Sequence, residues 1–134
     1  MTVWIELANL QKRCILTAMN ILLRLEGFCY AIAALLLYWQ LGFSWVLFAV
    51  LILVPDLSMI GYLAGPRISA ICYNIVHATP LPWVLLLAAH LSGNTVMLSI
   101  ALIWFAHIGI DRALGYGLKY VSSFKDTHLG RIGR

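Results

Sequence analysis

The chain has 134 residues, 63% of them hydrophobic and only 10% charged, whereas soluble domains contain about 25% charged residues. Nine Lys and Arg residues against five Asp and Glu residues give a formal net charge of +4. A small soluble fold cannot bury so much apolar surface. The composition therefore excludes a secreted disulfide scaffold, a nucleic-acid-binding domain and a disordered tail, and it predicts an integral membrane protein.

The first thirteen residues do not resemble a cleaved signal peptide, because acidic and amide side chains interrupt their apolar residues. Trp4, Ile5, Leu7 and Leu10 predict instead a short amphipathic segment on the membrane surface.

Four apolar stretches follow, and each should be helical because lipid offers no partners for free backbone groups. They cover about residues 15–41, 45–63, 68–91 and 95–114. Pro80 and Pro82 remove two amide donors from the third stretch and should kink it. The connections are short, so neighbouring helices should run antiparallel. The expected fold is an all-α, four-span antiparallel helix bundle.

The cationic residues predict the orientation of this bundle. Lys12, Arg13 and Arg24 precede or begin the first span, and Arg67 lies between the second and third spans. The others lie at or after the end of the fourth span: Arg112, Lys119, Lys125, Arg131 and Arg134. Under the positive-inside rule both termini are cytoplasmic, which predicts a multi-pass protein of the cytoplasmic membrane with a cytoplasmic tail at 115–134.

Each predicted span carries a polar side chain in its cytoplasmic half, where such residues are costly and mark functional sites. These side chains are Glu26, Asp56, His77 and His107. At about 1.5 Å of rise per residue, all of them reach the same leaflet. His107 and Asp111, four residues apart, share a helix face. Tyr73 and Asn74 lie four and three residues before His77, so these three residues form one polar stripe.

Helix bundles build metal sites from inward-facing His and carboxylate side chains. Imidazole nitrogen and carboxylate oxygen suit Zn, Fe or Mn, and a divalent cation would balance several carboxylates at membrane depth. The predicted metal ligands are Asp56, Asn74, His77, His107 and Asp111.

A structural interpretation stays open beside this one. Arg24 could pair with Glu26 or Asp111. Arg112 could pair with Asp56, and these ion pairs would then only hold the helices together.

Further side chains are candidates for the chemistry itself. Glu26 or His128 would act as general base or acid. The cations expected to orient a phosphate or other anion at the headgroup level are Arg24, Arg112 and Lys119. The segment 115–134 is either a solvated tail near anionic headgroups or a cover that brings Asp126 and His128 to the site.

Several blocks of sequence are similar to those of a known family. The blocks lie at residues 23–27, 55–62, 73–77, 106–112, 115–120 and 124–130. Together they resemble a small bacterial integral-membrane family catalogued as domain of unknown function 4260. The resemblance implies a four-span protein of the bacterial inner membrane, and it implies no particular activity, substrate or cofactor.

Two classes of function are compatible with these residues. The first is a metal-dependent membrane enzyme, hydrolase-like, acting on a lipid or lipid-linked substrate. The second is a non-enzymatic protein: an ion-binding or proton-coupled carrier, or a structural subunit of a membrane assembly. The expected partners are membrane lipids and, in a homo-oligomer, further copies of the chain, with no nucleic acid.

Overall fold

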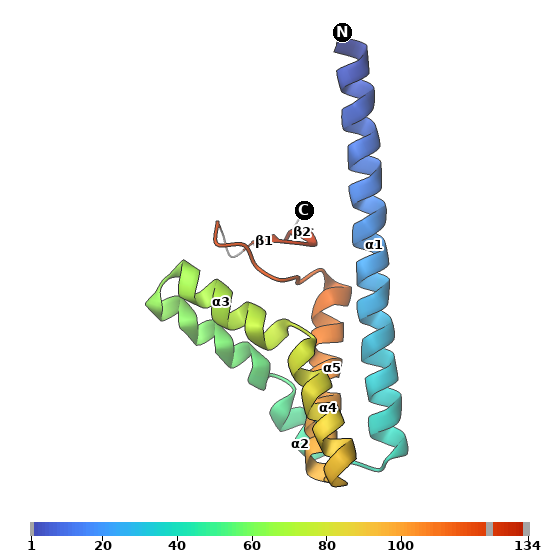
Figure 1. Cartoon of the computed structure of the whole chain (residues 1–134), viewed down its shortest axis with the longest axis vertical. Helices are drawn as coiled ribbons and strands as arrows, with labels where there is room; N and C mark the ends of the chain where they lie inside the picture. Colours follow the sequence, from blue (N-terminus) through green and yellow to red (C-terminus); the bar gives the residue numbers. More distant parts are fainter. Residues whose placement is uncertain (1, 123–124, 133–134) are drawn as a thin grey trace.

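The computed structural model describes residues 2–122 and 125–132 (Figure 1). Its elements in chain order are α1 (Thr2–Gln40), α2 (Trp45–Leu51), the 3-10 helix η1 (Val54–Ala64), α3 (Pro66–His77), α4 (Pro80–Ser92), α5 (Thr95–Leu114), β1 (Asp126–Thr127) and β2 (Gly130–Arg131). The two short strands pair antiparallel. Phe124, the first residue of the C-terminal block named above, lies outside the described residues.

Three helical stretches of the described chain are long and apolar enough to cross a membrane: Val3–Gln40, Pro66–Ser92 and Thr95–Leu114. They confirm the predicted all-α fold with membrane-length apolar helices. The predicted span at 45–63 differs, because it consists of the short helix α2 followed by η1. Pro55 lacks an amide proton, and the chain around it adopts the tighter 3-10 geometry rather than continuing α2.

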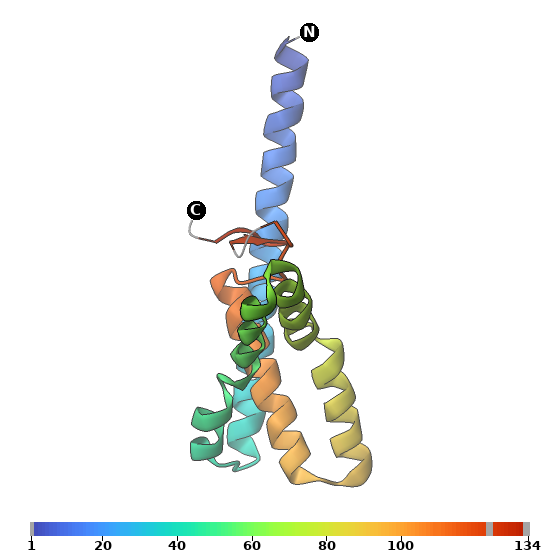
Figure 2. The ribbon, with the colours of Figure 1, turned by 90° about the vertical axis from the view of Figure 1, so that its left-hand side faces the viewer.

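The predicted amphipathic segment at the N-terminus is not a separate element. It continues into the first span as one helix of 39 residues, about 58 Å long. No proline occurs in α1, and its first glycine is Gly27, so nothing in the sequence interrupts the helix. In both views the N-terminal half of α1 extends beyond the other helices (Figures 1 and 2).

The predicted kink of the third span is confirmed. Helix α3 ends at His77, Ala78 is extended at φ −85° and ψ 142°, and α4 begins at Pro80. The helices on the two sides of the kink point in different directions. Helix α3 packs against η1, and α4 packs against α5 (Figure 1). The end of α3 is therefore held beside the middle of the bundle.

Helices α1 and α5 approach unusually closely through small residues. A Cβ atom added to Gly109 would lie 2.6 Å from the backbone nitrogen of Ala31 and 2.7 Å from the carbonyl oxygen of Gly27. Small residues at helix interfaces allow such close backbone contact in membranes. This contact fixes the direction in which the last two turns of α5 present their side chains.

Candidate metal centre

Four side chains from three elements converge at the C-terminal end of α5. Asp56 comes from the first turn of η1, His77 is the last residue of α3, and His107 and Asp111 lie one turn apart on α5. One ligand atom from each lies within 4.8 Å of the ligand atoms of the other three. We call these four residues the His–Asp cluster.

The separations within the His–Asp cluster suit a single ion. The two Nε2 atoms of His77 and His107 lie 3.1 Å apart. Asp56 Oδ1 is 3.5 and 3.6 Å from these nitrogens, and Asp111 Oδ2 is 3.5 and 3.7 Å from them. A tetrahedral site with bonds of 2.0–2.1 Å has ligand atoms about 3.3–3.4 Å apart. The cluster has nearly the size that such a site requires.

Burial differs among the four side chains of the His–Asp cluster. The side chains of His77 and His107 are 4% and 5% exposed, and that of Asp111 is 18% exposed. Asp56 is 39% exposed. The cluster is thus closed on its imidazole side and open beside Asp56.

The backbone of α3 sets the tautomer of His77. Its Nδ1 lies 3.0 Å from the carbonyl oxygen of Tyr73. A carbonyl oxygen can only accept, so Nδ1–H donates and neutral His77 presents the Nε2 lone pair to the cluster. Hydrogen bonds of this kind orient histidine ligands in metal sites.

Tyr73 supports the cluster with its side chain as well. Its ring stacks on the His77 imidazole, with centroids 3.7 Å apart and planes 12° apart. Its hydroxyl donates to Asp111 Oδ2 over 3.1 Å. Tyr73 therefore holds one imidazole and one carboxylate at the same time.

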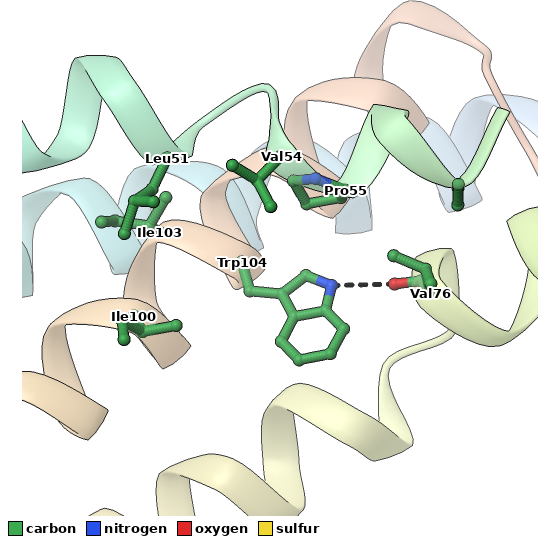
Figure 3. A pocket seen from close by; sticks show the side chains of 8 residues that line it. Leu51, Val54, Pro55, Val76, Ile100, Ile103 and Trp104 are labelled. Carbon is green, nitrogen blue, oxygen red and sulfur yellow. Dashed lines mark hydrogen bonds between the residues drawn. The ribbon is translucent and has the colours of Figure 1, made fainter. Parts of the chain in front are cut away.

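A second supporting contact joins α3 to α5. The indole N–H of Trp104 donates to the carbonyl oxygen of Val76 over 2.8 Å (Figure 3). In an uninterrupted helix this carbonyl would accept from residue 80, but Pro80 has no amide proton. Val76 adjoins His77 and Trp104 lies one turn before His107, so this bond holds the two histidines in register.

The chain beyond α5 returns to α3 through Asn74. The Asn74 amide nitrogen donates to the carbonyl oxygen of Lys119 over 2.9 Å, and its oxygen accepts from the Lys119 N–H over 2.7 Å. Asn74, predicted as a metal ligand, thus uses both amide groups on the Lys119 backbone. These two hydrogen bonds attach the C-terminal segment to α3, and the role of Asn74 as a metal ligand stays a prediction.

Lys119 lies over the other side of this arrangement. Its ammonium is 4.5 Å from the centroid of the Tyr73 ring, and the residue is 4% exposed. Loss of hydration lowers the pKa of Lys119 to about 8, although the carboxylates of Asp111 and Asp56 oppose the shift. A buried amine therefore lies near the His–Asp cluster, and it belongs to one of the three cationic residues predicted to orient an anion.

The predicted cation Arg24 has an intramolecular role in the structure. Its Nε donates to the carbonyl oxygen of Ala113 over 3.1 Å, and its Nη2 donates to that of Leu114 over 2.8 Å. These carbonyls end α5, where a cation is favourable. Arg112, on the same turn, packs its Cβ where a side chain at Gly27 would lie.

The two predicted acid–base residues lie outside the His–Asp cluster. Glu26 is exposed on α1, and its Oε1 accepts from the hydroxyl of Tyr30 over 3.1 Å. His128 Nδ1 accepts the N–H of Leu118 over 2.8 Å. Partial burial lowers the pKa of His128, and the positive charge of Arg112 adds to that effect.

The sequence prediction placed Tyr73 on the polar stripe of His77 but did not include the supporting residue Trp104. A signal for Trp104 existed, because Pro80 leaves the Val76 carbonyl in need of a donor. What the sequence does not provide is which residue of α5 reaches that carbonyl.

Comparisons with known proteins agree with the family suggested by the sequence blocks. No curated protein and no solved structure matches the chain. The family model described as "Domain of unknown function (DUF4260)" matches residues 20–132, which is most of the chain. With its recurring blocks inside this match, the chain belongs to the DUF4260 family.

Proposed function

We propose that the His–Asp cluster binds a divalent metal ion and that the protein uses this ion to hydrolyse a lipid or lipid-linked substrate. The observation that carries the proposal is the convergence of four ligand atoms from η1, α3 and α5 at separations of 3.1–3.7 Å for the five pairs measured. The orientation of His77 supports it, because the Nε2 lone pair points into the group.

The chemistry of the ligands favours Zn, Mn or Fe. Two imidazole nitrogens and two carboxylate oxygens suit these ions, whereas a soft metal would favour thiolate. The structural interpretation with Arg24 as an ion-pair partner of Asp111 is less well supported, since the Arg24 guanidinium binds the last carbonyls of α5.

Such an ion would supply a water molecule with its pKa lowered toward about 7. In hydrolysis the water oxygen bonds to the carbonyl carbon or phosphorus, the bond to the leaving oxygen breaks, and that oxygen takes a proton. We propose that Glu26 or His128 takes the proton that the attacking water loses and passes it to the leaving oxygen. Lys119, Arg112 and Arg24 are the proposed contacts for an anionic group of the substrate. Access is from the Asp56 side, where the cluster is open.

A second candidate is a non-enzymatic ion site. Four protein ligands fill a tetrahedral zinc, and closed sites of this kind are structural, whereas catalytic zinc keeps an open position. Here the ion would fasten η1 and α3 to α5, as in a structural subunit or an ion-binding carrier. Six-coordinate Mn or Fe would instead leave two positions for water and substrate, so the identity of the ion bears on the choice.

Metal analysis of the detergent-purified protein tests the proposal. We expect about one equivalent of metal per chain, with affinity lowered at least ~100-fold in His77→Ala, His107→Ala and Asp56→Asn. The matched control is His90→Ala, an imidazole near the exposed end of α4. Metal-free protein with a normal melting profile would refute both candidates. Stoichiometric metal without hydrolysis of any phospholipid or lipid-linked ester would favour the second.

The proposal also places the chain in the bacterial inner membrane with both termini cytoplasmic, in contact with lipids and with further copies of itself. The distribution of cations supports this orientation, because Arg24 and Lys119 lie at the cluster end of the molecule. Ser44→Cys and Ser92→Cys variants should react with an impermeant thiol reagent from the periplasm. Protection of both would refute the orientation.

A further inference from the structure

The structure contains an apolar pocket of about 360 Å³ whose lining includes Val54, Ile103 and Trp104 (Figure 3). Its walls come from α2, η1, α3 and α5, and Ser58 is the one polar residue among those that line it. The single indole N–H in the wall, that of Trp104, is engaged by the Val76 carbonyl. The pocket therefore offers dispersion contacts and almost no hydrogen bonding.

Residues that line the pocket are directly followed in sequence by residues of the His–Asp cluster on two elements. On η1, Pro55 lines the pocket and Asp56 follows it; on α3, Val76 lines the pocket and His77 follows it. These adjacent pairs place the pocket and the cluster along a shared boundary.

On α5 the pocket extends away from the cluster along the helix. Ile103 lies one turn before His107 and Ile100 lies two turns before it, on the same face. From Ile100 to His107 the helix rises about 10 Å. A ligand that lies along this face has a polar end at the cluster and an apolar end between α2 and α5.

We propose that this pocket binds one alkyl chain of a lipid whose polar group, the ester or phosphate to be cleaved, lies at the His–Asp cluster. The assignment of that polar group as a scissile bond rests on the proposed function, whereas the binding of the chain does not. An alkyl chain fits because the walls are apolar, and a chain with a polar head fits because the polar His–Asp cluster borders one end only.

The test measures binding of terminally brominated straight-chain fatty acids of increasing length. Trp104 serves as the fluorescent reporter, in a variant whose other tryptophans, Trp4, Trp39, Trp45 and Trp83, are phenylalanine. We expect saturable quenching, with affinity rising about fourfold per added methylene until the pocket is full and constant thereafter. Metal-loaded protein should bind each acid more tightly than metal-free protein, because the carboxylate then meets the ion.

Two variants of α5 separate the pocket from the general lipid surface. Ile100→Trp fills the pocket and should lower the affinity at least ~10-fold. Val96→Trp adds the same side chain at an exposed position one turn earlier and should leave the affinity unchanged. A Tm equal to that of the parent in both variants establishes that they are folded. Quenching that does not saturate, or that is equal in the two variants, would overturn the proposal.

The same measurement on His77→Ala/His107→Ala protein distinguishes the two proposals. Saturable, length-dependent binding that persists in this variant would support the pocket independently of the cluster, and the same binding in unmutated protein that contains no metal and shows no turnover would refute the enzymatic function. Metal binding and hydrolysis that are independent of chain length and unaffected by Ile100→Trp would do the reverse.

Discussion

Helix α5 is packed in two ways: we call residues 95–106, the longer part, its apolar half, and residues 107–114 its C-terminal half. In the apolar half, Leu102, Phe105 and Ala106 are buried against Ala34 and Tyr38 of α1 in an apolar core. Such contacts depend on volume and shape, and residues of similar size can replace one another. The core holds the helices together without fixing any particular atom.

The C-terminal half depends on individual atoms. His107 and Asp111 belong to the His–Asp cluster, Tyr73 donates to Asp111, and Tyr116 N–H donates to the Asp111 carbonyl as the helix ends. Each of these polar contacts depends on the direction of particular atoms. Removing one such atom is therefore destabilising even when the volume of the side chain is conserved. One helix can thus combine a core that accepts substitutions of similar size with a site that accepts few substitutions. This requires a rigid contact that holds both parts in place, here the close approach of Gly109 to α1.

The largest expected effect comes from breaking that fixed contact. Gly109→Val would place its Cβ 2.6 Å from the Ala31 backbone, which cannot move away as a flexible side chain could. We expect destabilisation at or above the upper end of the ~1–3 kcal/mol typical of overpacking, together with loss of metal binding. Thermal unfolding in detergent and metal content measure both. Ala18→Val, on the exposed side of α1, should change neither; a Gly109→Val protein with unaltered Tm would contradict this account.

Trp104→Phe should weaken the site next most strongly. It keeps an aromatic ring and removes only the N–H that satisfies the Val76 carbonyl. Leaving that carbonyl without a donor costs about 1–3 kcal/mol. Metal affinity should also fall about 10–100-fold, as for other residues that orient ligands. The control is Trp83→Phe, at a half-exposed position on α4. Equal metal affinity in the two variants would show that the bond does not align the histidines.

Tyr73→Phe should act on the site alone. It removes the hydroxyl that donates to Asp111 Oδ2 and keeps the ring that stacks on His77. We expect metal affinity to fall about 10-fold by titration calorimetry, with little change in Tm. Tyr120→Phe, at an exposed position, is the control. A large loss of Tm without loss of affinity would mean that Tyr73 serves the core instead.

Phe105→Leu is the reciprocal change in the apolar half. Phe105 is buried and packs edge-on against Trp83, with ring centroids 4.9 Å apart. We expect a loss of about 1 kcal/mol in unfolding free energy and unchanged metal affinity, because the change reduces volume without removing a directed contact. If metal affinity fell as much as in Tyr73→Phe, the two halves of α5 would not be distinct.

The sequence predicted the components of the His–Asp cluster because helix geometry is regular. A fixed rise per residue placed Asp56, His77 and His107 at one depth, and a spacing of four placed Asp111 on the face of His107. Polar side chains are costly in contact with lipid at this depth, so they are expected to face the interior of the bundle and contact one another.

The sequence could not predict contacts that depend on the return of a distant segment. The spacing of three residues from His77 predicts Asn74 as a ligand, but it does not indicate that Lys119, 45 positions away, engages both of its amide groups. The division of the span at 45–63 was missed for another reason. Hydropathy reports whether a stretch is apolar, and around Pro55 it does not distinguish an α-helix from a 3-10 helix.

His128→Asn should have the smallest effect and concerns the segment that follows α5. Burial lowers the pKa of His128 in the folded protein, so the unfolded chain binds more protons between that lowered pKa and the ordinary value near 6.5. Stability from this group is therefore complete above about pH 6.5 and is lost as the pH falls through that window. We expect the Tm of His128→Asn protein to decline less steeply on acidification than that of the parent. An identical acid profile for the two proteins would show that His128 does not link the C-terminal segment to folding, and would leave the C-terminal half of α5 dependent on the His–Asp cluster and its direct contacts.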